Sequence, residues 1–112
     1  MMVNIEKTGS VEVVSFTINK INALVTDEIR EHISRLFEHA GSKVILDLKG
    51  VEYIDSTGFS CLLNCYRESK NNYGILKIAC PEPSVQKLFE VLHLHTIFEI
   101  CPDTESCLRS FR

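Results

Sequence analysis

Segments with the composition of β-strands alternate with segments of helical periodicity along almost the whole chain, and this order limits the possible folds more than any other feature. Residues 11–18 are rich in β-branched and aromatic side chains, which are common in strands. Residues 44–48 and 75–80 are short apolar runs suited to strands that are buried on both faces. A helical pattern follows each run. This order predicts an α/β domain with a mixed, mostly parallel sheet of about four to five strands and about four helices.

The first third of the chain is expected to hold a hairpin and a helix. A turn cluster at residues 8–10 precedes the strand at residues 11–18, so we expect a hairpin over about residues 3–18. A helix is predicted over about residues 26–40, with Gly41 as its left-handed stop. The apolar positions of this helix recur at steps of three and four: Val25, Ile29, Ile33, Leu36, Phe37 and Ala40.

The remaining elements follow the same alternation. A second helix is predicted to open at residues 55–58 and to end near Asn71, and Ser84 is the expected N-cap of a third helix. Residues 97–101 are expected to form a last strand before a short final helix. No linker is indicated, so residues 1–112 are predicted to form one domain. Eleven side chains of these helices are expected to face the core: Phe59, Leu62, Leu63, Tyr66, Val85, Leu88, Phe89, Leu92, Cys107, Leu108 and Phe111.

Length and charge exclude several kinds of protein. The chain has 112 residues, enough for one domain with its own core. Its 12 Lys and Arg against 15 Asp and Glu give a net charge of −3, and the cations do not cluster, so direct binding to DNA or RNA is not expected. No apolar run approaches the roughly 18–20 residues that span a bilayer. Residues 1–7 lack the pattern of a secretory signal, so a cytoplasmic location is expected.

The five cysteines are interpreted as reduced packing residues. Their number is odd, no pair has the CxxC spacing of redox or zinc sites, and most lie in apolar segments. Cys61 and Cys65 share one helical face, but two thiols without further ligands do not make a metal site. We therefore expect neither a metal nor a cofactor.

The segment Asp55-Ser56-Thr57-Gly58 carries the most functional information, because it places two hydroxyl side chains where a loop turns into a helix. The first turn of a helix presents unpaired backbone N–H groups and the positive end of the helix dipole, both of which favour an anion. A phosphate on Ser56 would be tolerated there and would add about −1.5 to −2 charges to the surface that a partner meets. Taken alone, the four residues have a more ordinary interpretation as a simple N-cap.

The longer segment resembles the signature of the STAS domain, specifically that of bacterial anti-sigma factor antagonists. The apolar run at residues 44–48, followed by residues 51–54 and then Asp55-Ser56-Thr57-Gly58, is similar in order and spacing to the family's strand and helix-opening motif. Residues 83–89 resemble its third-helix motif, and residues 92–98 resemble the lead-in to its final strand. The resemblance extends from about residue 11 to the end of the chain.

This resemblance implies a partner-switching regulator that is not an enzyme. In the family, the serine that matches Ser56 is phosphorylated by a kinase that is also an anti-sigma factor. The unphosphorylated antagonist binds this kinase and frees the sigma factor, the phosphorylated form is released, and a PP2C-type phosphatase restores it. Ser56 is then the phosphate acceptor, with Thr57 as the lesser candidate, and ATP would belong to the kinase. The expected partner surface comprises Asn22, Asp55, Ser56, Thr57, Gly58 and Phe59.

Two positions depart from the family pattern. Many members carry Gly-Glu/Arg-Leu/Ile-Asp before the first helix, where this chain has Asn19-Lys20-Ile21-Asn22. The glycine is lost and the aspartate is replaced by Asn22, so a charged contact there is expected to be absent or replaced. After the motif the family often has Leu-Gly, where this chain has Phe59-Ser60. Phe59 is expected to be either a core residue or a larger exposed anchor. Gly58 is expected to let a partner backbone approach. Both departures leave open which kinase this chain would recognise and whether the factor it would control is a sigma factor.

Other functions fit the sequence less well. The alternative within the same fold is a STAS scaffold or accessory subunit of a signalling or lipid-transport assembly without a phospho-switch. A receiver domain would use Asp47 as its acceptor, but residues 19–22 lack the acidic pair of such a site. The sequence contains no CxxC pair, so it does not indicate a redox enzyme. No GxSxG frame surrounds Ser56, so it does not indicate a serine hydrolase either. His93 and His95 form a His-x-His pair without further ligands, so no metal site is expected.

Overall fold

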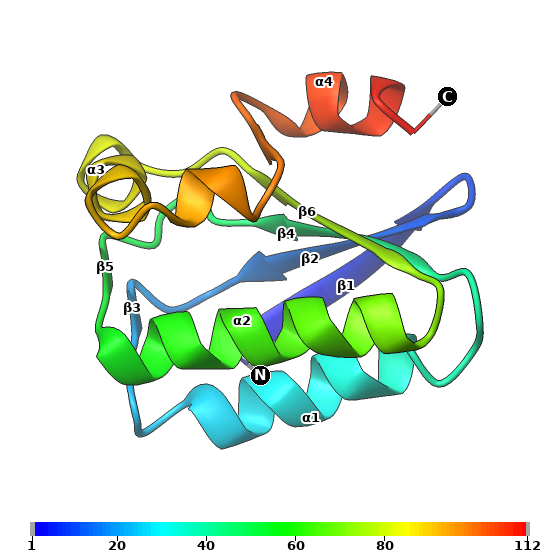
Figure 1. Cartoon of the computed structure of the whole chain (residues 1–112), viewed down its shortest axis with the longest axis horizontal. Coiled ribbons are helices and arrows are strands. Elements are labelled where there is room, and N and C mark those ends of the chain that lie inside the picture. The colour runs from blue at the N-terminus through cyan, green and yellow to red at the C-terminus, as the bar shows by residue number, and fades with distance from the viewer. Residues whose placement is uncertain (1, 112) are drawn as a thin grey trace.

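The computed structural model describes residues 2–111, which form a five-stranded sheet with helices on both faces (Figure 1). The strands of this sheet are β1 (Val3–Thr8), β2 (Val11–Phe16), β4 (Lys43–Asp47), β6 (Ile75–Ala79) and β7 (Ile100–Cys101). They follow the order β1-β2-β4-β6-β7, in which β1 and β2 are antiparallel and the other pairs are parallel. The predicted α/β fold with a mixed, mostly parallel sheet and an N-terminal hairpin is confirmed.

A second, two-stranded sheet was not expected from the sequence. It pairs β3 (Lys20–Ile21) in parallel with β5 (Tyr53–Ile54). Only two residues of each strand pair. A strand this short has no recognisable periodic pattern, so residues 51–54 could not be distinguished from a loop by sequence. This small sheet positions the starts of two helices, since β5 leads directly into α2 (Ser56–Asn71) and β3 leads toward α1 (Thr26–Leu36).

The helices are divided between the two faces of the main sheet (Figure 1). One face is covered by α1 (Thr26–Leu36) and α2 (Ser56–Asn71), and the other carries α4 (Thr104–Arg109). At one end of the molecule, α3 (Pro83–Val91) is followed by the 3₁₀ turn η1 (Leu94–Thr96). The expected helices are therefore all present, although their limits differ in places from the predicted ones.

Two hydrophobic clusters lie on opposite sides of the sheet. The larger cluster lies under α1 and α2 and includes Ile33, Leu46, Leu62 and Ile78. The smaller lies under α4 and comprises Val11, Ile45, Ala79, Cys101 and Cys107. Alternating residues of β4 belong to different clusters, as expected for a strand buried on both faces.

The first helix ends earlier than predicted. It stops at Leu36, and the N–H of Phe37 donates to the carbonyl oxygen of Ser34 at 3.1 Å, a tighter turn than that of an α-helix. The fully buried ring of Phe37 holds the chain against the core at this point, while Ala40 is exposed, contrary to the predicted stripe. Gly41 does adopt the left-handed conformation with φ of +80°, but in the turn after the helix.

Three predictions in the last third of the chain are wrong. Ser84 is not the N-cap of α3: Glu82 is, and the Ser84 hydroxyl donates to the carbonyl oxygen of Glu52 at 3.0 Å. Leu92 is exposed, because the helix ends at Val91 before Leu92 can turn inward. The last strand is limited to β7, since η1 precedes it and only two residues pair with β6.

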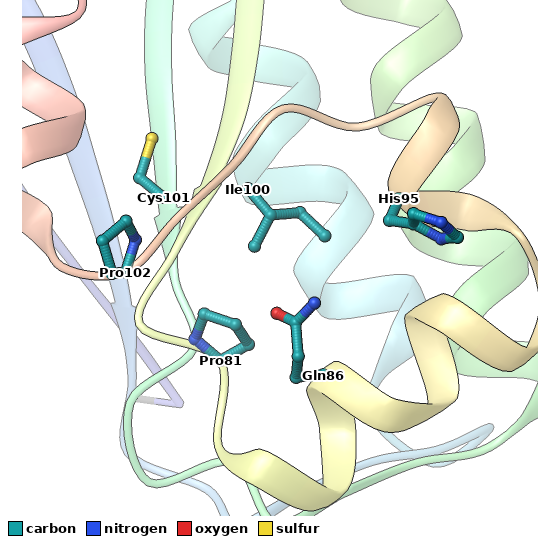
Figure 2. Close-up of a pocket in the computed structure, with 6 residues that line it drawn as sticks. All are labelled: Pro81, Gln86, His95, Ile100, Cys101 and Pro102. Atoms are coloured by element: carbon teal, nitrogen blue, oxygen red, sulfur yellow. The ribbon is translucent and has the colours of Figure 1, made fainter.

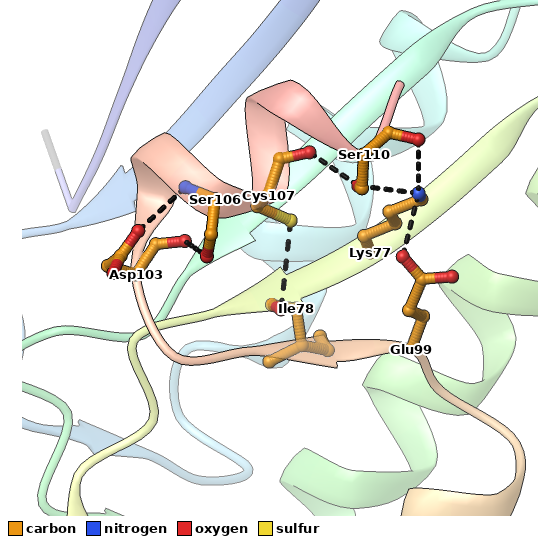
Figure 3. Close-up of polar contacts among 7 residues, drawn as sticks. All are labelled: Lys77, Ile78, Glu99, Asp103, Ser106, Cys107 and Ser110. Carbon is orange, nitrogen blue, oxygen red and sulfur yellow. Dashed lines mark hydrogen bonds and ion pairs between the residues drawn. The ribbon is translucent and has the colours of Figure 1, made fainter. Parts of the chain in front are cut away.

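The short helix α4 is fastened to the sheet by a lysine (Figure 3). The Lys77 ammonium donates to the Ser110 hydroxyl at 2.7 Å and forms an ion pair with Glu99 at 2.7 Å, and its side chain is only 10% exposed. It also lies 4.4 Å from the centre of the Phe111 ring. With the fully buried Cys107, these contacts hold α4 over the smaller cluster.

Candidate functional site

The Asp55-Ser56-Thr57-Gly58 motif forms the capped N-terminus of α2. Asp55 is the N-cap, and its Oδ1 atom accepts a hydrogen bond from the Gly58 N–H at 2.8 Å. The carbonyl oxygen of Asp55 accepts the first intrahelical bond, from Phe59 N–H at 2.9 Å. The ordinary N-cap role is thus performed by Asp55, which leaves both hydroxyl residues of the motif free for another role.

Gly58 is required by contacts within the chain. A Cβ atom at this position would lie 2.5 Å from the carbonyl oxygen of Ile21 and 2.6 Å from a methyl carbon of Ile54. Both atoms belong to the small sheet, so the first turn of α2 packs directly on β3 and β5. The expectation that Gly58 makes room for a partner's backbone does not match its position, because the residue is buried and the space is already occupied.

Ser56 and Thr57 are both exposed at the end of this fixed turn. In the described part of the chain, neither hydroxyl makes a hydrogen bond, and the N–H groups of the two residues have no backbone acceptor. These N–H groups are among the first four of the helix, which have no intrahelical partner. The arrangement offers an accessible hydroxyl beside free donors and the positive end of the dipole of a 16-residue helix.

The loop before α1 lies beside this turn and presents an apolar side chain. The Asn22 side chain accepts a hydrogen bond from the Leu24 N–H at 3.0 Å, and the Asn22 carbonyl accepts one from Val25 N–H at 3.0 Å. This double turn holds Leu24 in solvent, where it is 91% exposed. The Asn22 side chain is therefore engaged in shaping the loop.

Tyr53 supplies a second exposed apolar group next to the motif. It lies in β5, two residues before the N-cap, and is 50% exposed. Its pairing partner across the small sheet is Lys20, so the β3 and β5 strands bring Tyr53, Ser56 and the Leu24 loop to one side of the molecule. Sequence reasoning missed both Leu24 and Tyr53, because a single apolar residue in a polar link carries no periodic signal.

Phe59 belongs to the core. It is 5% exposed and packs edge-on against Phe89, with 5.2 Å between ring centres. Of the two expectations for this residue, the core position is the one observed. Phe59 therefore supports the start of α2 from inside and offers almost no surface to a partner.

A small polar notch of about 160 Å³ lies between the first turns of α1 and α2. Cys61 faces it from α2 but is only 2% exposed. The hydrogen bond from Cys65 lowers the pKa of the Cys61 thiol, and the same bond, together with burial, raises the pKa of Cys65. Because Cys61 is buried, this pair packs the α1–α2 contact and does not form an accessible nucleophile. The notch is lined by Thr26, Asp27, Arg30, Thr57, Ser60, Cys61 and Asn64.

Another depression, of about 480 Å³, lies between α3 and β7 (Figure 2). Its walls contain two prolines and no carboxylate, and their two titratable side chains, His95 and Cys101, lie on opposite sides of the depression in Figure 2. The rings of His93 and His95 are 6.3 Å apart, and among residues 2–111 no three His, Cys, Asp or Glu side chains are grouped as metal ligands. This depression therefore lacks the paired groups that acid–base or metal chemistry requires.

Comparison with known families identifies the fold. The family model of the STAS domain matches residues 2–107. The chain belongs to the STAS domain family. Among curated relatives, the candidate anti-sigma factor antagonist BtrV of Bordetella bronchiseptica is 22% identical over 92 residues, which are 82% of this chain and 79% of BtrV.

Solved structures agree with this assignment at the level of the fold. A STAS protein described as an anti-sigma-factor antagonist from Planctomyces limnophilus superposes with a TM-score of 0.87 at 18% identity, covering 96% of each chain. The Bacillus cell-fate determinant SpoIIAA in its phosphorylated form gives a TM-score of 0.73 at 20% identity, covering 98% of this chain and 99% of SpoIIAA. Among the described residues of the present STAS domain, no helix has the length and apolarity needed to cross a membrane.

Proposed function

We propose that this STAS domain is an anti-sigma factor antagonist whose partner binding is switched by phosphorylation of Ser56. In its unphosphorylated form it binds an anti-sigma factor with serine kinase activity in the cytoplasm and frees a sigma factor. Phosphorylation releases it, and a PP2C-type phosphatase restores it. The chain acts as a substrate and a binding module, and ATP is bound by the kinase.

The observation that carries this proposal is the exposure of Ser56 on a rigid helix terminus. The Asp55 cap and the packing of Gly58 against β3 fix the backbone on both sides of Ser56, while its own side chain takes no part in the fold. A phosphate can therefore be added with little change to the folded domain. A partner that covers this turn would meet a large change in charge. Burying an unpaired dianion costs several kcal/mol, so phosphorylation would weaken the binding of that partner.

The apolar side chains beside Ser56 supply the attraction in the unphosphorylated state. Burying apolar surface contributes about 25 cal/mol per Å², so Leu24 and Tyr53 are suited to be anchors of the contact. Asn22 acts indirectly, by holding Leu24 outward through its 3.0 Å hydrogen bond. Asp55 and Gly58 position the turn, and Thr57 borders it as the lesser candidate acceptor.

The direct test is a phosphosite map. The full chain is incubated with ATP and a candidate kinase, namely any histidine-kinase-like ATPase whose gene lies beside that of this chain, and the modified residue is located by mass spectrometry. Stoichiometric label on Ser56 that disappears in Ser56→Ala supports the proposal. Label that remains in Ser56→Ala, on Thr57 for example, shows that the acceptor is wrong. No label with a kinase that nevertheless binds the chain favours a scaffold without a phospho-switch.

Leu24 provides an independent test of the binding surface. Replacing it with serine should weaken kinase binding about 10-fold or more, since truncating a buried interface anchor commonly costs over 1 kcal/mol. Tyr73, 86% exposed just after the other end of α2, is the matched control, and Tyr73→Ser should leave the affinity unchanged. Isothermal titration calorimetry measures both. Equal affinities for the two variants would remove Leu24 from the interface.

A further inference from the structure

The outer edge of β1 is an open strand edge. β1 is the first strand in the sheet order, and among residues 2–111 no strand pairs with its outer side. Five of its six residues are exposed, and it contains no proline or glycine to interrupt it. Edges of this length usually present unpaired N–H and C=O groups to other chains. The opposite edge, β7, has only two residues and is followed by Pro102, so it offers much less.

The hydrogen-bond pattern of the hairpin determines which backbone groups of β1 face outward. Thr17 N–H donates to the Met2 carbonyl at 2.9 Å, which makes residues 2 and 17 a hydrogen-bonded pair. Such pairs alternate along an antiparallel ladder. Asn4 and Glu6 therefore pair with β2, whereas the N–H and C=O groups of Val3, Ile5 and Lys7 point away from it.

The outward N–H and C=O groups of β1 match those of a second, antiparallel copy of the same strand. Two antiparallel copies of β1, related by a two-fold axis at Ile5, would pair Val3 with Lys7 of the second copy and Ile5 with its own equivalent. All outward-facing N–H and C=O groups would then be satisfied. The same register places Glu6 opposite Asn4 of the second copy, which allows an amide-to-carboxylate hydrogen bond. The Ile5 side chain, 37% exposed in one chain, would lie against its symmetry mate.

Charge excludes the neighbouring symmetric registers. A shift of the axis to Glu6 would set two glutamates directly opposite each other, and a shift to Lys7 would do the same to two lysines. Like charges in directly opposed positions are destabilising. An axis at Asn4 would leave Lys7 without a partner. The register centred on Ile5 is therefore the one that combines complete backbone pairing with no repulsion.

We propose that β1 is a self-association surface, through which two copies of this chain join their sheets into one continuous sheet. A two-fold contact between identical surfaces closes on itself and does not propagate into fibres. Because edge pairing alone covers less than the roughly 800 Å² per partner of a typical stable interface, the dimer should be weak. This inference does not depend on the phospho-switch, since β1 pairs only with β2 and Ser56 follows β5.

Sedimentation velocity on the full chain, from about 10 μM to about 1 mM, tests the proposal. The mass should rise toward that of a dimer with concentration, and Ile5→Lys, which sets two cations opposite each other, should abolish the rise. Tyr73→Lys is the control and should behave like the wild type. A chain that stays monomeric throughout this range, or a dimer that Ile5→Lys leaves intact, would overturn the proposal.

Amide hydrogen exchange gives a second readout that does not require a variant. In a monomer, the N–H groups of Ile5 and Lys7 face solvent and exchange quickly, while those of Asn4 and Glu6 are protected by β2. In the proposed dimer, Ile5 and Lys7 become protected as the concentration rises. Exchange at these two amides that is independent of concentration, in a sample that sediments as a dimer, would place the contact elsewhere.

Discussion

At the level of single residues, the motif at the start of α2 contains residues that shape the turn and a residue that is exposed to a partner. Asp55 and Gly58 define the turn through a 2.8 Å hydrogen bond and through close packing on Ile21. Ser56 lies between them, is exposed, and has no hydrogen bond from its hydroxyl within the described residues. Changes at Gly58 should therefore affect stability, and changes at Ser56 should affect recognition.

Substitution of Ser56 should alter partner binding in a charge-dependent way. Ser56→Ala should bind the kinase with an affinity close to that of the wild type and should not be phosphorylated. Ser56→Asp should bind at least about 10-fold more weakly, because a carboxylate buried without a partner costs well over 1.4 kcal/mol. Calorimetric titration with the kinase measures both affinities. Equal affinities of the two variants would contradict an electrostatic switch.

Substitution of Gly58 should destabilise the domain. The added methyl group would overlap the Ile21 carbonyl oxygen at 2.5 Å, so β3 or the first turn of α2 must move. Overpacking of this kind costs about 1–3 kcal/mol, against which the better helix propensity of alanine offsets up to about 1 kcal/mol. Urea unfolding of Gly58→Ala should show a net loss, whereas Ser60→Ala, at an exposed site on the same helix, should change little.

At the level of elements, α4 is the shortest of the described α-helices. It has six residues, and only Cys107 among them is buried. Much of its attachment is polar and passes through Lys77, which joins the C-terminal end of the helix to Glu99 (Figure 3). A cation at that end also interacts favourably with the helix dipole.

Replacing Lys77 with methionine should loosen α4 while leaving most of the domain intact. The variant retains an apolar stem but loses the hydrogen bond to Ser110, which contributes about 1.5–3 kcal/mol, and the ion pair to the exposed Glu99, which adds little. Amides of α4 should exchange about 10- to 100-fold faster, as a local opening. The exposed Lys87 provides the control, Lys87→Met. Unchanged exchange in α4 would mean that Cys107 packing alone holds the helix.

At the level of the whole molecule, the small size and weak net charge of the domain give a phosphate a large relative effect. The chain carries −3, and a phosphate of about −2 would bring it to about −5. Phosphorylation of Ser56, as proposed above, would place the added charge at the positive end of α2, outside both hydrophobic clusters. The fold should therefore be the same in both states while the electrostatic surface differs.

The stability of the Ser56→Asp variant tests this separation of fold and surface. An acidic residue in the first turn of a helix contributes about 0.3–1 kcal/mol through the dipole, so the variant should be as stable as the wild type or slightly more stable. Its thermal unfolding midpoint should not fall, and its amide chemical shifts should change only near the start of α2. Loss of more than about 1 kcal/mol would show that Ser56 has a structural role.

The local sequence was sufficient to predict the alternation of strands and helices, the capped start of α2 and the position of Ser56. These features depend on neighbouring residues: the period of apolar side chains and a capping carboxylate before the helix. The end of α1 was predicted too late, because the burial of Phe37 overrides local helix preference. The N-cap of α3 was predicted wrongly, because the Ser84 hydroxyl donates to Glu52 instead of capping the helix.

The surface around Ser56 was decided by the tertiary structure alone. The pairing of β3 with β5 brings the Leu24 loop and Tyr53 to the end of the molecule at which α2 begins, and the need for glycine at position 58 arises from Ile21, on a different strand. Contacts between residues so far apart along the chain leave no periodic pattern near either one. The sequence by itself therefore determined the motif that places Ser56 in the first turn of a helix, and the packing of distant segments determined which surface surrounds that turn.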